Sequence, residues 1–225
     1  MKQHIPDNSV DMVFTDPPYG IDGAKLDKHY NRKESNVIDG YVEVAKEKYQ
    51  DFSNQWIAEC DRALKPSGSA YIISGYTCLR EILNALANTD LVEINHIIWE
   101  YSFGVYTKLK YVSSHYHILY YVKPPIKNKT FNTFCRMEDT KTSYHDRIDV
   151  MQIPREYKPG IIKNKNQLPE ALVEKFIAYS SNEGDLVLDP FLGGFTTAIV
   201  AKKMNRNIIG FELNKNAYDY FVNTI

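Results

Sequence analysis

The chain has 225 residues, a net charge of −1 and a hydrophobic content of 44%, a composition typical of a globular protein. Its three cysteines form no close pair, so neither a disulfide framework nor a zinc site is indicated, and a reducing cytoplasm is the expected compartment. No apolar run has the length of a membrane span, and the first residues lack the apolar core of a secretion signal. The length suits a single domain, 1–225, that carries a small inserted lobe.

The predicted elements alternate along the chain. Strands are expected at 10–15, 69–74, 92–99, 115–122, 186–188 and 207–211, and helices at 41–64, 79–87, 169–179, 196–204 and from 216 onward. This alternation predicts an α/β protein with a mostly parallel sheet covered on both faces. Ligands of such sheets bind at the carboxyl ends of the strands, where both motifs described below fall.

Charge is distributed unevenly. Between Tyr101 and Lys165 there are 12 Lys/Arg against 5 Asp/Glu, so this segment is basic in an otherwise acidic chain. Such asymmetry is typical of an element that faces nucleic acid, and a solvated lysine-rich loop is the equally weighted alternative. The stretch at about 124–160 lacks sustained periodicity and is expected to be an insertion.

The first motif is Asp16-Pro17-Pro18-Tyr19, at the end of the strand predicted at 10–15. Two prolines fix φ and lack N–H groups, so they hold a carboxylate and an aromatic ring in a stiff frame at the rim of the sheet. Asp16 and a proline carbonyl could bind both hydrogens of an exocyclic amine, and Tyr19 could stack on a base taken out of its helix. A strand-ending turn with a surface tyrosine is the structural alternative, but the flanking Asp and Tyr favour the functional interpretation.

The second motif runs from Asp185 to Glu212 and combines a strand, a glycine-containing turn, a helix, a strand and an acidic residue. Gly193 and Gly194 allow the backbone to approach a ligand closely, and Glu212 can accept hydrogen bonds from ribose hydroxyls. Asp189 and Glu212 are separated by 23 residues, which fits the spacing of about 20 expected of a nucleotide-binding fold. The G-x-G-x-x-G pattern is absent, which argues against a nicotinamide cofactor.

Together the motifs resemble those of the amino-group DNA methyltransferases, whose catalytic motif is Asp, Asn or Ser before Pro-Pro and an aromatic residue, and whose cofactor motif is D-P-F-x-G-S-G-T-T. The order of the motifs resembles the beta class, in which a target-recognition region lies between them, the place of 124–160 here. The resemblance spans nearly the whole chain. It implies a Rossmann-like, S-adenosylmethionine-dependent methyltransferase with helices on both faces of a mixed sheet. It also implies methylation of adenine N6 in duplex DNA after base flipping, because Asp at the first catalytic position is commoner among adenine enzymes.

The resemblance also assigns residues. The catalytic set is Asp16, Pro17, Pro18 and Tyr19. The cofactor set is Gln167, Leu168, Pro169, Asp189, Phe191, Gly193, Gly194, Thr196, Thr197 and Glu212. Within it, Thr196 and Thr197 are expected to cap the following helix. The basic candidates for DNA binding are Lys108, Lys110, Lys127, Lys129, Arg136 and Arg147.

Two features depart from the family pattern. Phe195 stands where the family has the second glycine of G-S-G. Its ring is expected either to crowd the cofactor or to pack into the interface between sheet and helix, and the second is favoured. The chain also starts almost at the catalytic strand, so the resemblance implies a sheet of seven strands less one edge strand and a more open adenine pocket.

Weaker signals leave alternatives open. His115 and His117 share one face of a strand, but the sequence places no third ligand, so no metal is expected. Phe52 and Trp56 are interpreted as core residues. Besides double-stranded DNA, a cognate restriction endonuclease and a second copy of the chain are candidate partners. A cytosine-N4 methyltransferase, a methyltransferase of RNA or of a protein amide, and a catalytically silent DNA-binding subunit are the alternative functions.

Overall fold

The computed structural model describes the chain apart from residues 21–43, 102–103, 105, 107, 136–141 and 156–166. The strands are β1 (Val10–Thr15), β2 (Leu64–Ser74), β3 (Val92–Glu100), β4 (His115–Val122), β5 (Val150–Gln152), β6 (Leu186–Asp189) and β7 (Asn207–Gly210). The helices are η3 (Lys46–Lys48), α2 (Tyr49–Ala63), α3 (Leu79–Leu86), η4 (Ile126–Asn128), α4 (Ser143–Asp146), α5 (Glu170–Ser180), α6 (Thr196–Lys203), α7 (Lys215–Phe221) and η5 (Val222–Thr224).

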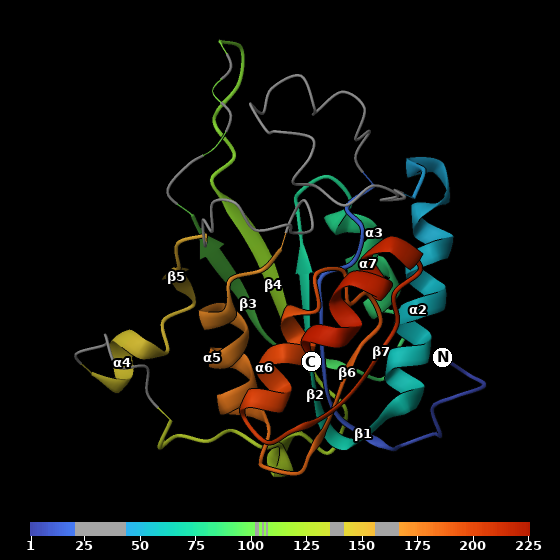
Figure 1. Ribbon diagram of the computed structural model, residues 1–225. Coiled ribbons are helices and arrows are strands. Elements are labelled where there is room, and N and C mark those ends of the chain that lie inside the picture. Colours follow the sequence, from blue (N-terminus) through green and yellow to red (C-terminus); the bar gives the residue numbers. More distant parts are fainter. Residues whose placement is uncertain (21–43, 102–103, 105, 107, 136–141, 156–166) are drawn as a thin grey trace.

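The seven strands form one mixed sheet in the order β5-β3-β4-β2-β1-β6-β7 (Figure 1). β1 pairs in parallel with β2 and β6, and β6 pairs in parallel with β7. β4 is antiparallel to β2 and β3, and β5 is parallel to β3. The carboxyl ends of β1, β2, β6 and β7 therefore lie at the same end of the sheet, which we call the carboxyl end. The predicted α/β, Rossmann-like class is confirmed.

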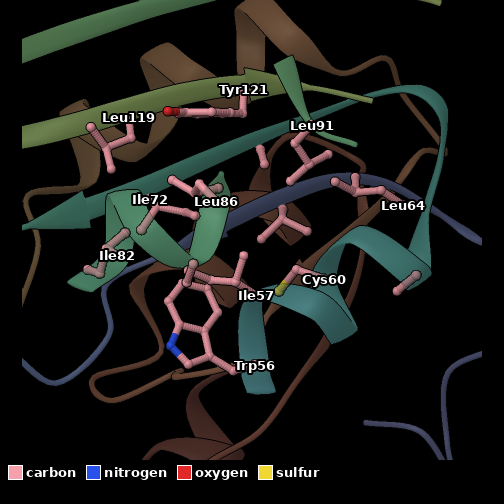
Figure 2. Packing of buried hydrophobic residues seen from close by; sticks show 14 of the residues in the cluster. Trp56, Ile57, Cys60, Leu64, Ile72, Ile82, Leu86, Leu91, Leu119 and Tyr121 are labelled. Atoms are coloured by element: carbon pink, nitrogen blue, oxygen red, sulfur yellow. The ribbon is translucent and has the colours of Figure 1, made fainter. Parts of the chain in front are cut away.

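Side chains of β1 alternate between two cores. Val13 packs with α2 and α3 on one face, in the cluster that also holds Trp56, Ile72 and Ile82 (Figure 2). Met12 and Phe14 pack with α5 and α6 on the other face. Every residue of β1 except Asp11 is buried, because a central strand of a parallel sheet is covered on both faces.

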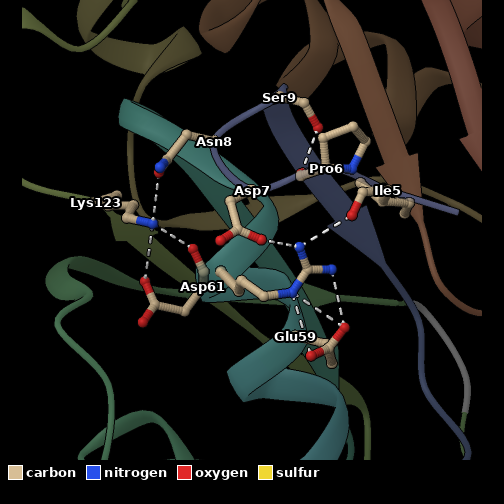
Figure 3. Close-up of polar contacts among 9 residues, drawn as sticks. Ile5, Pro6, Asp7, Asn8, Ser9, Glu59, Asp61 and Lys123 are labelled. Atoms are coloured by element: carbon tan, nitrogen blue, oxygen red, sulfur yellow. Dashed lines mark hydrogen bonds and ion pairs between the residues drawn. The ribbon is translucent and has the colours of Figure 1, made fainter. Parts of the chain in front are cut away.

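The end of the sheet opposite the carboxyl end is tied by polar contacts (Figure 3). Arg62, near the end of α2, donates to the carbonyl of Ile5 at 3.0 Å and forms ion pairs with Asp7 and Glu59. Lys123, directly after β4, donates to Asn8 at 3.1 Å. These contacts hold the segment before β1 against α2 and β4, so the start of β1 is fixed in register.

Most predicted elements are observed, and β1 and β4 have the predicted bounds. The helix expected at 41–64 begins at Tyr49, after η3, and residues 41–43 lie outside the described part. β2 starts at Leu64 instead of Ser69, across the expected loop, with a register irregularity opposite β1. The stretch 124–160 was expected to be irregular, but it contributes β5, which is too short to show a periodicity. The expectation of a sheet that lacks one edge strand is therefore wrong: β5 supplies the seventh strand, and β7 forms the other edge of the sheet among the described residues.

Candidate active site

A cavity of about 630 Å³ opens at the carboxyl end of the sheet. The strands that carry the two motifs, β1 and β6, are neighbours, and the Thr15 hydroxyl donates to the Asp189 carboxylate at 2.9 Å. Both motifs therefore reach one cavity, as the sequence predicts. The predicted residues that line it are Asp16, Pro17, Pro18, Tyr19, Gln167, Leu168, Asp189, Phe191, Gly193, Gly194, Thr196, Thr197 and Glu212.

The catalytic motif follows β1 directly. Tyr19 donates from its hydroxyl to the Asp16 carboxylate, and Tyr49 of α2 donates to the Pro18 carbonyl. Gly20 has φ +64°, and a Cβ there would meet Cys78 Sγ at 2.7 Å, so the turn out of the motif requires glycine. These contacts hold Asp16 in one orientation at the cavity wall.

Tyr19 is buried, so the alternative of a strand-ending turn with a surface tyrosine is excluded. Its side chain is 7% exposed and stacks on Tyr116 of β4, with ring centroids 5.3 Å apart. Burial, followed by the negative charge of Asp16, raises the pKa of the Tyr19 phenol, so its hydroxyl stays protonated as a donor. One face of the ring is thus covered by Tyr116.

The glycine turn and Glu212 brace one another. The Gly193 N–H donates to Glu212 Oε2 at 2.8 Å, and the Asn214 N–H donates to Glu212 Oε1 at 2.6 Å. Gly193 has φ +52°, and a Cβ on Gly194 would lie 3.1 Å from the Gln167 side chain. Gln167 therefore packs directly against the turn, which leaves no room for a side chain at position 194.

Asp189 is a buried acid in the floor of the cavity, 3% exposed. Burial raises the pKa of its carboxyl to about 6, although hydrogen bonds from Thr197, the Phe191 N–H and Thr15 oppose the shift. A positive charge beside Asp189 would favour its ionised form.

The start of α6 confirms one expectation and corrects another. Phe195 is 2% exposed and packs with Ala198, Ala217 and Phe221, so its ring lies between α6 and α7 and not in the cavity. The favoured interpretation, that the ring of Phe195 is buried away from the cofactor, is therefore confirmed, but the ring packs between two helices and not between sheet and helix. The expectation that Thr196 and Thr197 cap α6 is wrong, because the N-cap is Phe195, in the left-handed region, with no side-chain cap bond. Both threonines lie inside the first turn.

Pro169 and the described basic candidates for DNA binding do not line the cavity. Pro169 precedes α5 as its N-cap. Lys108 and Lys110 are exposed and lie just before β4, whose first residues pair with the carboxyl end of β2. Lys127 and Lys129 follow the far end of β4, at the opposite end of the sheet (Figure 1). Arg147 is exposed after α4, at the β5 side of the molecule, and Arg136 lies outside the described residues.

The sequence analysis missed a wall of the cavity formed by α2. Trp56 belongs to a core cluster and Phe52 packs against it, as predicted, but both also line the cavity, together with Gln55 and Glu59. Trp56 meets Phe191 edge to face, with centroids 5.4 Å apart. Its side chain is 5% exposed, yet its Nε1 has no hydrogen-bond partner among the described residues. Polar residues at 55 and 59 beside buried rings were the signal in the sequence, because a purely structural helix face would be apolar throughout.

The chemistry of the lining fits a cationic nucleoside. Four acidic side chains, Asp16, Glu59, Asp189 and Glu212, line the cavity, and no Lys or Arg is among its described lining residues. An anionic pyrophosphate would be repelled there, whereas a sulfonium or ammonium group would be stabilised. The buried Trp56 Nε1 offers an additional donor to a ligand. S-adenosylmethionine combines a positive charge, a ribose and an adenine ring, and it fits this set of residues.

Three histidines lie together on β3 and β4, outside the cavity. His96 Nε2 and His117 Nδ1 lie 2.8 Å apart, and His115 contacts His117. Burial, with His96 and His115 nearby, lowers the pKa of His117 to about 4. No group of three side chains placed to hold a metal occurs within the described part of the chain. Among the same residues, no helix combines the length and apolarity that a membrane crossing requires.

Comparison with known proteins identifies the family. The model of the N6/N4 DNA methylase family matches residues 10–223, so the chain belongs to this family of DNA methyltransferases, whose methyl donor is S-adenosylmethionine. The type II methyltransferase M.HpaI of Haemophilus parainfluenzae is 33% identical over 95% of this chain and 67% of its own. The DNA adenine methyltransferase YhdJ of Escherichia coli is 35% identical over 93% and 74%. The type II methyltransferase M.BamHI of Bacillus amyloliquefaciens is 34% identical over 94% and 52%. The chain thus spans about half to three quarters of these relatives.

Solved structures share the fold. The M1.HpyAVI–SAM complex has a TM-score of 0.66 at 24% identity, covering 100% of this chain and 92% of that one. The PvuII DNA methyltransferase, named as cytosine-N4-specific, has a TM-score of 0.72 at 17% identity, covering 96% and 79%. At these identities the likeness establishes the architecture alone.

Proposed function

We propose that this chain transfers the methyl group of S-adenosylmethionine to adenine N6 in duplex DNA, after the target base is flipped out of the helix. The observation that carries the proposal is the position of Asp16 on the same cavity as the glycine turn and Glu212. Asp at this position is the commoner residue in adenine enzymes, and a relative of 35% identity is named as an adenine methyltransferase.

The reaction needs an amino nitrogen whose lone pair is directed at the methyl group. Asp16 accepts one amino hydrogen, and we assign the second to the Pro17 carbonyl because the Pro18 carbonyl already accepts from Tyr49. Two fixed acceptors favour a pyramidal nitrogen, which is a better nucleophile than a nitrogen conjugated with the ring. The Tyr19 hydroxyl, donating to Asp16, keeps the carboxylate aligned.

Cofactor binding is assigned to the other half of the cavity. Glu212, held by the N–H groups of Gly193 and Asn214, would accept hydrogen bonds from the ribose, and the Asp189 carboxylate would stabilise the positive charge of the cofactor. Gln167, which packs against Gly194, and Leu168 line the same cavity and would close over the cofactor. Bound in this way, S-adenosylmethionine supplies an electrophilic methyl group, so positioning accounts for most of the catalysis and no covalent enzyme intermediate is required.

We further propose duplex DNA as the macromolecular partner, with a cognate restriction endonuclease and a second copy of the chain as additional partners. Two relatives named as type II methyltransferases support the restriction-modification context. The cytoplasmic location expected from three widely spaced cysteines stays a prediction.

Sequencing of unmodified genomic DNA after incubation with protein and S-adenosylmethionine tests the proposal. We expect N6-methyladenine at one short recurring sequence. If N4-methylcytosine is found instead, the chain is a cytosine-N4 methyltransferase with the same fold. If isothermal titration shows cofactor binding but neither modified base appears, RNA or a protein amide becomes the substrate to test. If the protein binds DNA but not the cofactor, it is a catalytically silent DNA-binding subunit.

A further inference from the structure

A cluster of three aromatic rings surrounds Arg155, close to the catalytic motif. The guanidinium carbon lies 5.7 Å from the ring centroid of Trp99, 5.1 Å from that of Tyr101 and 5.1 Å from that of Tyr116. Arg155 Nη2 donates to the Tyr116 hydroxyl at 2.7 Å. We call these four residues the Arg155 cage.

The cage continues into the catalytic motif through stacked rings. Trp99 stacks on Tyr116 with centroids 5.4 Å apart, and Tyr116 stacks on Tyr19 at 5.3 Å. Tyr19 in turn donates to Asp16. Gly75, the residue after β2, lies beside both tyrosine rings, and a Cβ there would meet each at 3.9 Å. A continuous series of contacts therefore runs from Arg155 to the carboxylate that receives the target amine.

The cage is fixed to the sheet from two sides. Trp99 and Tyr116 are directly paired residues of β3 and β4, and Trp99 also pairs with Met151 of β5. Trp99 Nε1 donates to the Ile153 carbonyl at 2.8 Å, which holds the segment that carries Arg155. The position of the guanidinium thus depends on β5 and the residues directly after it, within the stretch at about 124–160 that was expected to be an insertion.

A contribution to folding stability does not by itself explain why an arginine is buried in this cage. Within the described residues Arg155 has no carboxylate partner, and its Nε is buried without a hydrogen-bond acceptor. Leaving a buried donor unsatisfied is costly, although contact with three ring faces offsets part of that cost. The pKa of Tyr116 is raised to about 12, chiefly by burial, so its hydroxyl remains neutral and accepts from Arg155.

We infer that Arg155 is a positioning residue for methyl transfer: by holding Tyr116 against Tyr19, it fixes the ring and hydroxyl of Tyr19, which orient Asp16 and the target base. This inference rests on the proposed transfer of a methyl group at Asp16. It adds a residue from the stretch at about 124–160 to the residues that hold the target base. It predicts that Arg155 affects turnover and base capture more than cofactor binding.

The test compares Arg155→Met, Arg155→Lys and Tyr116→Phe with Arg80→Met, a matched removal of an arginine whose side chain is 82% exposed. Tritium transfer from labelled S-adenosylmethionine to unmodified genomic DNA measures methylation of adenine or cytosine alike. For Arg155→Met we expect kcat to fall at least about tenfold, with cofactor Kd unchanged within about twofold. Arg155→Lys should recover part of the rate, because it keeps the cation but loses the planar fork.

A double-mutant cycle separates positioning from general destabilisation. If Arg155 acts through the Tyr116 hydroxyl, Arg155→Met with Tyr116→Phe should be no slower than Arg155→Met alone. Fluorescence of 2-aminopurine at the methylated position, identified by sequencing, should rise less with Arg155→Met than with wild type, because the flipped base is held less well.

Additive rate losses, unchanged fluorescence, or a rate loss no larger than that of Arg80→Met would overturn the inference. So would a parallel decrease of cofactor affinity and melting temperature in both Arg155→Met and Arg155→Lys, which would make the cage purely structural. A wild-type chain that methylates cytosine would contradict the adenine assignment but leave this test intact. A wild-type chain that transfers no tritium would instead contradict the proposed function.

Discussion

Phe195 stacks on Phe221, with ring centroids 5.8 Å apart, while its own backbone has φ +60°. The ring therefore binds α6 to α7 at a position whose conformation favours glycine. The left-handed backbone explains why the family pattern has glycine at this position. The contact between α6 and α7 explains why this chain has phenylalanine.

Replacing Phe195 separates these two effects. Phe195→Ala should lower the free energy of unfolding by about 3 kcal/mol, because it leaves a cavity between α6 and α7. Phe195→Gly should lower it by about 1 kcal/mol less, because glycine relieves the left-handed strain. Chemical denaturation measures both, and cofactor titration should give an unchanged Kd. Tighter cofactor binding by Phe195→Gly at an unchanged melting temperature would show that the ring intrudes on the cavity.

Asp16→Ala should abolish methyl transfer and leave cofactor binding near normal, because Asp16 is assigned to the base. A decrease of kcat below about tenfold, or about 1.4 kcal/mol of barrier, is too small for this role. Tyr19→Phe is the matched control, since it keeps the stacked ring and removes only the hydroxyl that donates to Asp16. Its rate should lie between those of wild type and Asp16→Ala.

The basic residues at the two ends of β4 should contribute differently to DNA binding. Lys108→Ala with Lys110→Ala removes charge near the carboxyl end of the sheet, where the cavity opens. If these lysines bind phosphates, the log–log salt slope of DNA affinity should become shallower by roughly 0.9 for each phosphate no longer bound. Lys127→Ala with Lys129→Ala removes the same charge at the opposite end and should change the slope little. The reverse result would place the DNA surface on the η4 side.

Cofactor affinity should depend on pH through Asp189. Burial raises the pKa of this carboxyl to about 6, so the folded protein binds the proton more tightly than the unfolded chain. The contribution of Asp189 to stability is therefore present at low pH and is lost as pH rises from about 4 to about 6. A cationic cofactor favours the ionised form, so its affinity should fall by up to about tenfold per pH unit below about pH 6.

Titration calorimetry between pH 5 and 7.5 checks this dependence. Asp189→Asn should flatten it, whereas Asp51→Asn, on the exposed face of α2, should leave it unchanged. If wild type and Asp189→Asn share one pH profile, the positive charge of the cofactor lies elsewhere in the cavity.

The fold class and most of the cavity could be predicted from local sequence patterns. Buried parallel strands are continuous apolar runs, so β1 could be predicted with its observed bounds, and α2, α3 and α5 showed helical spacing. The two motifs were found because each is a short local pattern. Both line one cavity, as do Gln167 and Leu168, since the parallel neighbours β1 and β6 end at the same place.

What depends on contacts between distant residues became visible only in three dimensions. β5 exists because three residues pair with β3, and three residues carry no periodicity. Trp56 forms a cavity wall because α2 meets Phe191, and the Arg155 cage joins residues of β3 and β4 to the segment that follows β5. The basic segment is divided between two ends of the sheet because antiparallel β4 carries the chain across it. Composition records how many lysines a segment has, but strand direction decides which of them lie beside the cavity.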